Sequence, residues 1–445
     1  MELRDLIVTP VIILLVYTIA YLIRPLVTDE VNRKYFFPAL TVRIIGALAV
    51  GFVYQFYYGG GDTFAYHTHG SRVIWEAFID SPAKGLDLLF SNGQHHAETY
   101  SYSNRIWYFR DQQSFFIIRV AAFLDAFTFS TYSGTAVLFA VIAFTGSWLL
   151  FLCFYKLYPD FHRWLSIACM FIPTVFFWGS GIFKDTLTLA ALEVATFLAF
   201  KISEDRKGSL LYVGIFVLCC WVIYSIKIYI LLTFLPAIIL WTFTRYLVNV
   251  QSQMLKILML PFTIILSVVS GYYAIQKVAE DDPRYNLQRI AETAKITAYD
   301  IRYGWGARAG EGSGYTLGEL DGSFESLVRL APQAINVSLF RPYLWEVRNP
   351  FMLLSAVEGL ILLGITFYVL IKARTDFFRR MSQPEILFCM IFSLVFAFSV
   401  GVSTYNFGTL SRYKIPLMPY YLVGIGLIYY YSKRERKLSE LEETE

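Results

Sequence analysis

Residues 129–155 read FSTYSGTAVLFAVIAFTGSWLLFLCFY, a run of apolar and small polar side chains without a single charge. An α-helix of about 20 such residues crosses about 30 Å of hydrocarbon. The chain of 445 residues is 56% hydrophobic and 18% aromatic, with a mean hydropathy of +0.51, which excludes an ordinary soluble protein. The sequence therefore predicts an all-α polytopic integral membrane protein.

Similar apolar runs recur along the whole chain, and their lengths predict about eleven transmembrane helices. We expect these helices at about 5–25, 36–57, 129–155, 164–180, 184–202, 209–227, 228–247, 254–276, 350–371, 384–403 and 414–431. The expected organisation is a pair of N-terminal membrane helices (1–57), a first outer-face loop (58–128), a central membrane bundle (129–276), a second outer-face loop (277–349), C-terminal membrane helices (350–432) and a charged tail (433–445).

Lysine and arginine gather in the short loops on one side of this topology. The positive-inside rule makes that side cytoplasmic. We therefore expect an N-terminus outside, a cytoplasmic C-terminus and both long polar loops at the outer face of a bacterial inner membrane. The cations that set this orientation are Arg33, Lys34, Lys156, Arg163, Lys201, Arg206, Lys207, Arg245, Lys372, Arg374, Arg379, Arg380 and those of the tail from Lys433.

The first outer loop opens with YYGGGDTFAYHTHG, residues 57–70, directly after an apolar segment. One interpretation makes Asp62 the N-cap of a following helix, with the glycines letting the chain turn sharply. Another makes it a general base, with Tyr66 one helical turn further on the same face. Further along the loop, the pattern of residues 71–90 predicts two short interfacial helices. The apolar segment at residues 114–129 is too short and too charged to cross the membrane.

The second outer loop combines a predicted helix at 283–303 with GWGARAGEGSGYTLGELDGS, residues 304–323. So many glycines favour a loop that stays mobile until a ligand orders it, and we expect it above the active-site cavity. The cysteines lie in or beside apolar spans and indicate core residues rather than disulfides or metal ligands. No histidine spacing typical of a zinc site is present.

Charged residues also collect at successive turns that the topology places outside. Cations on this side run against the positive-inside rule, and ionisable groups near the membrane are costly without partners. An anionic lipid headgroup such as a pyrophosphate is one explanation, because arginine forks and lysine point charges bind phosphates well. Mutual ion pairing, Lys184 with Asp185 or Arg341 with Glu346, is the other. The turns contribute Lys184, Asp185, Lys227, Arg341, Trp345, Glu346, Arg412, Tyr413 and Lys414.

The stretches FWGSGIFKD (177–185), LFRPYLWE (339–346) and SRYKIPLMP (411–419), together with the loop aspartate, resemble the GT-C superfamily of membrane glycosyltransferases, in particular uncharacterised bacterial members of Bacteroidetes type. This resemblance implies transfer of a sugar from a polyprenyl-(pyro)phosphate donor to a glycan, lipid or protein acceptor. It makes Asp62 the base that activates the acceptor hydroxyl. It implies donor-phosphate binding by Lys184, Lys227, Arg341, Arg412 and Lys414, and substrate contacts by Tyr66, His67, Asp185, Trp345, Glu346 and Tyr413.

Only some members of that superfamily need a divalent cation, so a requirement for Mg²⁺ or Mn²⁺ stays open, and no metal ligand is predicted. The chemistry expected is an inverting single displacement, because the sequence identifies no second carboxylate at suitable range.

Other functions remain as alternatives. A polysaccharide polymerase or ligase acting on undecaprenyl-linked saccharides would depend on Arg341 and Arg412 and not on Asp62. A transporter or lipid flippase needs ionisable groups near the membrane midplane, where Glu193 is the clear candidate. A membrane scaffold without catalytic activity is also left open.

Overall fold

The computed structural model describes residues 2–204, 209–248, 324–374 and 376–442, together with residues 292, 295, 296, 299, 314, 315 and 317. The chain divides into two compact units, unit 1 (Met1–Ile228) and unit 2 (Tyr229–Glu445), and each is described by itself. The described residues form helices joined by turns, with one isolated β-bridge between Gly314 and Asn406.

Seven of the described helices are long and apolar enough to cross a membrane, which confirms the class of α-helical membrane protein. The predicted count of eleven is not confirmed. The seven are α1 (Leu3–Val27), α2 (Arg33–Phe56), α8 (Tyr132–Leu157), α11 (Lys184–Glu204), α12 (Ser209–Val248), α17 (Pro350–Ala373) and α19 (Pro384–Thr404).

The span predicted at 164–180 is not one continuous helix. The structure has two short helices there, α9 (His162–Met170) and α10 (Pro173–Trp178), and neither is long enough to cross a bilayer. The break comes at Ile172, which is extended (φ −73°, ψ 122°) because a residue before proline avoids the helical region.

The spans predicted at 209–227 and 228–247 correspond to the two helices that make up α12, which are joined at the non-helical residue Lys227 (φ −146°, ψ 76°). At 1.5 Å per residue the two halves are about 27 Å and about 31 Å long, so each is close to a membrane thickness. In place of the span predicted at 414–431 the structure has α20 (Phe407–Tyr413) and α21 (Met418–Glu442), and α21 is not among the seven candidates. The span predicted at 254–276 and the helix predicted at 283–303 lie outside the described residues, apart from the isolated positions named above, as does most of the glycine-rich loop.

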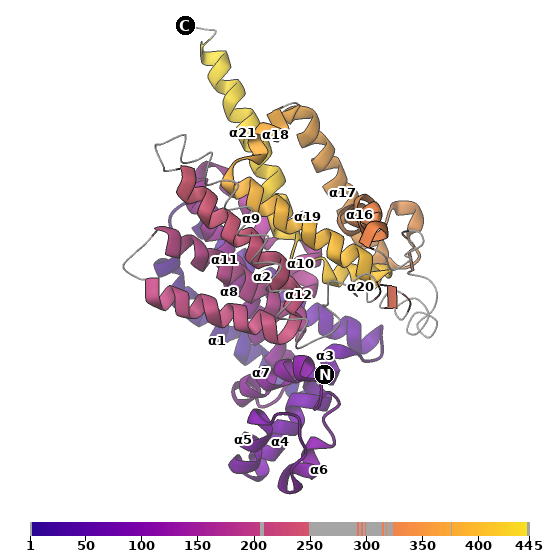
Figure 1. The fold of residues 1–445 in the computed structure, drawn as a ribbon. Helices are drawn as coiled ribbons and strands as arrows, with labels where there is room; N and C mark the ends of the chain where they lie inside the picture. Colours follow the sequence, from indigo (N-terminus) through magenta and orange to yellow (C-terminus); the bar gives the residue numbers. More distant parts are fainter. Residues whose placement is uncertain are drawn as a thin grey trace. The chain divides into compact units, whose positions relative to one another are not determined.

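In unit 1, helices α2, α8 and α11 pack side by side, with α1 against α8 (Figure 1). Two glycines permit the close approach. A Cβ on Gly146 of α8 would lie 2.7 Å from Cα of Ala190 on α11, and one on Gly46 of α2 would lie 2.1 Å from the carbonyl oxygen of Phe176 on α10. Such small residues let membrane helices gain van der Waals contact where there is no hydrophobic driving force between them.

Arg43, in the middle of α2, is almost completely buried. Its Nη1 donates to the carbonyl oxygens of Val175 and Gly179, both at 3.0 Å, and its Nη2 donates to Oγ of Ser147. The same Ser147 hydroxyl lies 3.3 Å from Oε2 of Glu193 on α11, whose carboxyl group faces the guanidinium. Arg43 thus donates to the carbonyl of Gly179, just beyond the end of α10, and adds a second hydrogen bond to the carbonyl of Val175, which already accepts from the backbone N–H of Gly179.

The segment between α2 and α8 gathers short helices at one end of unit 1 (Figure 1). Helices occupy the stretches where the sequence predicted them at 71–90 and 114–129, and their place at the membrane interface stays a prediction. They are α3 (Asp62–Tyr66), the π-helical turn η1 (His67–Ser71), α4 (Arg72–Asp80), α5 (Pro82–Phe90), the 3₁₀ turn η2 (Ala97–Thr99), α6 (Tyr100–Ser103) and α7 (Gln112–Thr128).

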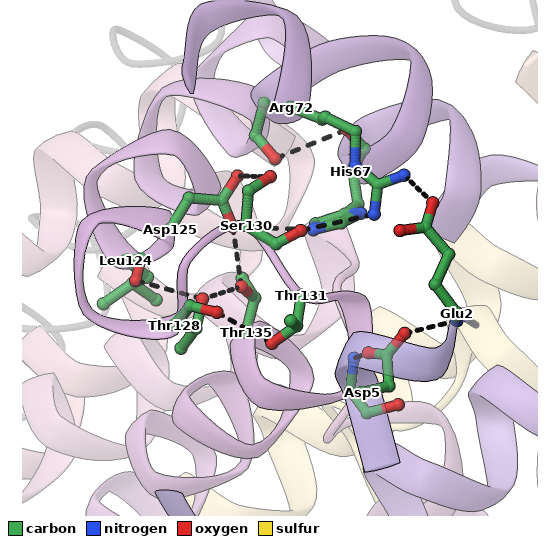
Figure 2. Close-up of polar contacts among 12 residues, drawn as sticks. Glu2, Asp5, His67, Arg72, Leu124, Asp125, Thr128, Ser130, Thr131 and Thr135 are labelled. Carbon is green, nitrogen blue, oxygen red and sulfur yellow. Dashed lines mark hydrogen bonds and ion pairs between the residues drawn. The ribbon is translucent and has the colours of Figure 1, made fainter. Parts of the chain in front are cut away.

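A buried polar network fastens this end to the bundle (Figure 2). Asp5 of α1 accepts a hydrogen bond from the backbone N–H of Ser133 at 2.8 Å. Asp125 of α7 accepts from the hydroxyls of Thr135 at 2.6 Å and Ser130 at 3.2 Å. The first residues of α1 and the last turn of α7 are therefore both tied to the start of α8.

The lowered pKa of Asp125 shows that this network stabilises a buried carboxylate. Burial alone would raise that pKa, but the adjacent His67 and the hydroxyls of Thr135 and Ser71 outweigh burial and hold it below its ordinary value. The carboxylate is therefore ionised in the folded protein at neutral pH.

Unit 2 is built on α16 (Phe324–Phe340), α17, α18 (Asp376–Met381), α19 and α21, with η7 (Leu344–Glu346) after α16 and α20 before α21. Glycines again mark close helix contacts. A Cβ on Gly401 would lie 2.3 Å from the carbonyl oxygen of Ala334, and one on Gly359 would lie 2.6 Å from that of Phe340. Trp241, in the second half of α12, stacks on Phe388 of α19 with ring centroids 4.9 Å apart.

We predict that Arg43→Ala destabilises the folded protein by about 3–5 kcal/mol, because it removes three buried hydrogen bonds, to Val175, Gly179 and Ser147, together with the cation that faces Glu193. Thermal unfolding of the detergent-solubilised protein measures the loss, with the exposed Arg163→Ala as control. The double variant Arg43→Met, Glu193→Leu should regain part of the stability, since no lone charge is left buried. Equal unfolding of Arg43→Ala and Arg163→Ala would contradict the role given to Arg43.

A second prediction concerns pH. Because the folded pKa of Asp125 lies below its unfolded value of about 3.9, its contribution to stability is full above about pH 4 and fades as the pH falls further. Unfolding of the wild type and of Asp125→Asn, measured from about pH 7 to about pH 3, should therefore converge on acidification. A gap that widens toward acid pH would show that Asp125 acts in its protonated form.

Candidate active site

The turn that carries Asp62 depends on glycine. Gly59, Gly60 and Gly61 have φ values of 70°, 136° and 133°, which side-chain-bearing residues rarely adopt. Gly61 is the N-cap of α3, and Asp62 is its first residue. The interpretation of Asp62 as the N-cap is therefore wrong. Its carboxylate stands in the first helical turn, where a negative charge is favoured by the helix dipole.

Lys184 is the residue through which the candidate site is assembled. It is the first residue of α11, and its Nζ lies 3.6 Å from Oδ2 of Asp111. It also interacts electrostatically with Asp62 and with Lys227. Residues from three distant parts of unit 1 thus place their charges around one ammonium group.

Asp111 was not identified from the sequence. It is the N-cap of α7 and accepts a hydrogen bond from the backbone N–H of Gln113 at 3.1 Å. The signal was present in DQQS, an aspartate directly before an apolar helical run. Burial alone would raise the pKa of Asp111, but hydrogen bonds from Ser114 and the charge of Lys184 outweigh it and lower that pKa. The carboxylate of Asp111 is therefore ionised at neutral pH.

Asp185 pairs with Lys227 and not with its neighbour Lys184. Nζ of Lys227 donates a hydrogen bond to Oδ1 of Asp185, and the two side chains are 9% and 0% exposed. The expected alternative of a Lys184–Asp185 pair is therefore wrong. Since Asp185 is closed off from solvent, this geometry gives it a structural contact, and its predicted role in binding substrate stays a prediction.

The predicted substrate contacts Tyr66 and His67 are also buried. Tyr66 is 3% exposed and packs near Tyr108, with ring centroids 5.6 Å apart. Nε2 of His67 lies 3.5 Å from Oδ1 of Asp125, longer than an ordinary hydrogen bond (Figure 2). Both side chains serve the packing of η1 against its neighbours, and direct contact with a sugar stays a prediction.

In unit 2, Arg341 makes the ion pair that the sequence left as an alternative. Its Nε lies 3.0 Å and 3.1 Å from the two carboxylate oxygens of Glu346, and the guanidinium lies over the ring of Phe407 at 5.4 Å. Burial alone would raise the pKa of Glu346, but the hydrogen bonds from Arg341 lower it. Trp345 is 82% exposed and stacks on Tyr343.

Lys414 differs from the other predicted phosphate ligands. It is 1% exposed, and within the described ranges its Nζ has no hydrogen-bond partner, although Glu358 acts on it electrostatically. Arg412 and Tyr413 lie beside it at the end of α20 and are partly exposed. All of these residues belong to unit 2, so a site shared with Asp62 stays a prediction.

Charge is distributed unequally between the two ends of unit 1. Asp62, Lys184 and Lys227 lie at the end where α2 finishes and where α8 and α11 begin, and Thr63 of α3 is hydrogen-bonded there to Tyr132 of α8 at 2.7 Å. At the other ends of α8 and α11, Lys156 and Lys201 interact with each other. The candidate site is thus the end away from these cation-bearing termini.

We predict that the two lysine pairs differ in their contribution to stability. Asp185→Ala should cost about 3 kcal/mol or more, because it leaves Lys227 charged and buried. Asp111→Asn should cost about 1 kcal/mol or less, since its side chain is 46% exposed and the asparagine can still cap α7. Denaturant or thermal unfolding measures both, and a larger loss in Asp111→Asn would overturn the ranking.

Among the residues that the structure describes, no three histidine, cysteine, aspartate or glutamate side chains are grouped to hold a metal ion. All five cysteines are free thiols. No protein-family model, no curated protein and no solved structure matches this chain. The functional argument therefore rests on the residues and geometry of the chain itself.

Proposed function

We propose that this chain is a multi-pass membrane glycosyltransferase that moves a sugar from a polyprenyl-(pyro)phosphate donor to a glycan, lipid or protein acceptor. The observation that carries the proposal is that Asp62 and Lys184 lie at the same end of unit 1, where the carboxylate acts electrostatically on the ammonium group. A carboxylate in the first turn of one helix and an ammonium in the first turn of another stand where the bundle ends. This is the pair of charges that glycosyl transfer from a phosphate requires.

Asp62 and Lys184 have different roles in the proposed reaction. Asp62 accepts the proton of the acceptor hydroxyl as its oxygen forms a bond to the anomeric carbon. The bond from that carbon to the phosphate oxygen breaks, and the electron pair leaves with the phosphate. Lys184 stabilises this leaving group, and its side chain is 17% exposed and so open to an anion. One displacement of this kind inverts the anomeric centre.

The orientation follows from the charge distribution in unit 1. Lys156, Lys201 and the exposed Arg163 lie at the ends of the helices away from Asp62. The positive-inside rule assigns those ends to the cytoplasm. Asp62 then stands at the outer face of a bacterial inner membrane, with the N-terminus outside, and about eleven membrane helices bring the C-terminus inside.

A polymerase or ligase that acts on undecaprenyl-linked saccharides is the second candidate, and unit 2 is the reason to keep it. Lys414 is buried as a cation, and Arg341 stands among aromatic rings a few residues before α17. In that function the cations of unit 2 carry the reaction and Asp62 is dispensable.

The test separates chemistry from binding. Asp62→Asn keeps the shape of the side chain and loses its basicity, so we predict a fall in transfer of about 10²- to 10⁴-fold with little change in donor binding. Asp80→Asn, an exposed carboxylate of α4 paired with Lys84, is the matched control and should transfer normally. Transfer is measured on the purified chain in lipid nanodiscs, with undecaprenyl-phosphate-linked hexoses as donors.

Variants of the cations complete the experiment. Lys184→Ala should weaken donor binding as well as rate, by about 1.5–3 kcal/mol for one charge-assisted bond. Arg341→Ala and Arg412→Ala should do the same if unit 2 contributes to the phosphate site. Normal transfer in Asp62→Asn with complete loss in the arginine variants would replace the proposal by the polymerase or ligase. Normal transfer in all variants would make these charges structural.

A further inference from the structure

Trp107 presents an exposed indole that is stacked on a neighbouring ring. The side chain is 66% exposed, and one face of the indole lies on the imidazole of His69. The ring centroids are 4.1 Å apart and the planes differ by 6°. The backbone N–H of Trp107 donates to the carbonyl oxygen of His69 at 3.2 Å. The indole is therefore supported from behind and anchored through its own backbone.

The hydrogen bond from the Trp107 backbone to His69 forms because the chain adopts a wider, π-helical turn at His69. Residues His67–Ser71 form a π-helical turn, and His69 within it has non-helical dihedrals (φ −101°, ψ 16°). The irregular turn leaves the His69 carbonyl available to a group outside the helix. Gly70 lets the turn press against α7, since a Cβ there would lie 2.8 Å from Cγ1 of Ile118. Single π-helical turns of this kind are frequent at functional sites.

The surroundings of Trp107 are polar rather than lipid-like. Arg105 is bound to Glu76 at 2.7 Å, and both side chains are about half exposed. Trp221 gives a comparison within unit 1: it is 53% exposed, rests on one aromatic ring, Phe116, and lies in the apolar helix α12. The exposed neighbours of Trp107 along the chain are Asn104, Arg105, Arg110, Asp111 and Gln112.

Trp107 and His69 are each close in the sequence to a residue of the candidate active site. Asp111 follows Trp107 by one short turn of chain, and its carboxylate contacts Lys184. His69 follows Asp62 along α3 and η1, at a distance of about 10 Å at 1.5 Å per residue. A chain molecule that lies across the indole can therefore reach the Asp62–Lys184 pair.

We infer that the exposed face of Trp107 is a binding platform for a pyranose ring of a saccharide substrate, with His69 as the positioning residue that fixes the indole. The axial C–H bonds of a pyranose form an apolar face with slight positive charge, which complements the negative face of an aromatic ring. Because the indole is held before the ligand arrives, little conformational entropy is lost on binding. The identification of this saccharide as the acceptor rests on the proposed function, whereas its binding does not.

The experiment measures saccharide binding by calorimetry on the full chain in detergent, with β-1,4-linked pentasaccharides of glucose and of N-acetylglucosamine and an α-linked mannopentaose as probes. Trp107→Ala should weaken the binding of at least one probe by about tenfold or more. Trp107→Tyr should restore most of it, and His69→Ala should weaken it less than Trp107→Ala. Trp221→Ala is the matched control and should bind as the wild type does.

Two results overturn the inference: no probe binds the wild type, or Trp107→Ala binds as Trp221→Ala does. A membrane role would appear differently, as quenching by brominated lipids of the fluorescence lost in Trp107→Phe, and this too would overturn it. The outcome is independent of the proposed function. Weakened binding in Trp107→Ala with normal transfer in Asp62→Asn would leave the platform standing and remove the glycosyltransferase mechanism.

Discussion

The guanidinium of Arg43 is the constraint from which the geometry of unit 1 follows. A helix end inside an apolar bundle leaves carbonyls that neither water nor lipid can satisfy. Arg43 donates to the carbonyl of Gly179, just beyond the end of α10, and also to that of Val175, which accepts from the backbone N–H of Gly179 as well. The chain then turns and α11 begins at Lys184. The position of the charged residues at the end of the bundle is therefore set by an interaction in its middle, where Glu193 offsets the charge of Arg43.

The lysines at the candidate site are not equivalent, although the sequence presents them alike. Lys227 and Asp185 are buried together, so exchanging either residue takes the opposite charge away from a buried one. Lys184 and Asp111 are partly exposed, and an exposed pair is worth little, so an anionic ligand can replace the aspartate at small cost. The difference in burial therefore gives the two lysines different roles. The Lys227–Asp185 pair holds α11 to α12 at the kink, whereas Lys184 is the lysine that can exchange its aspartate for an anionic ligand.

Length and hydropathy were sufficient to predict α1, α2, α8, α11, α17 and α19 to within a few residues, because the thickness of the bilayer fixes both quantities. They failed at 164–180, where a window of apolar residues conceals the break before Pro173. The pairing of charges failed for a different reason. Adjacent residues on a helix point in different directions, so Lys184 and Asp185 face different partners. Those partners, Asp111 and Lys227, lie far away in the sequence, and spacing alone cannot identify them.

The segment 58–128 provides residues of the candidate site and also holds them in fixed positions. Asp125 and Asp5 tie α7 and the start of α1 to the first turn of α8 (Figure 2). Thr63 of α3 is hydrogen-bonded to Tyr132 on the same helix. Reacting groups must be held to within about 0.5 Å, which mobile loops seldom achieve. In this chain Asp62, the His69 turn and the N-cap Asp111 all stand on short helices that share these supports. A set of charges placed at helix termini in this way stays fixed in relation to one another, as the proposed reaction would require.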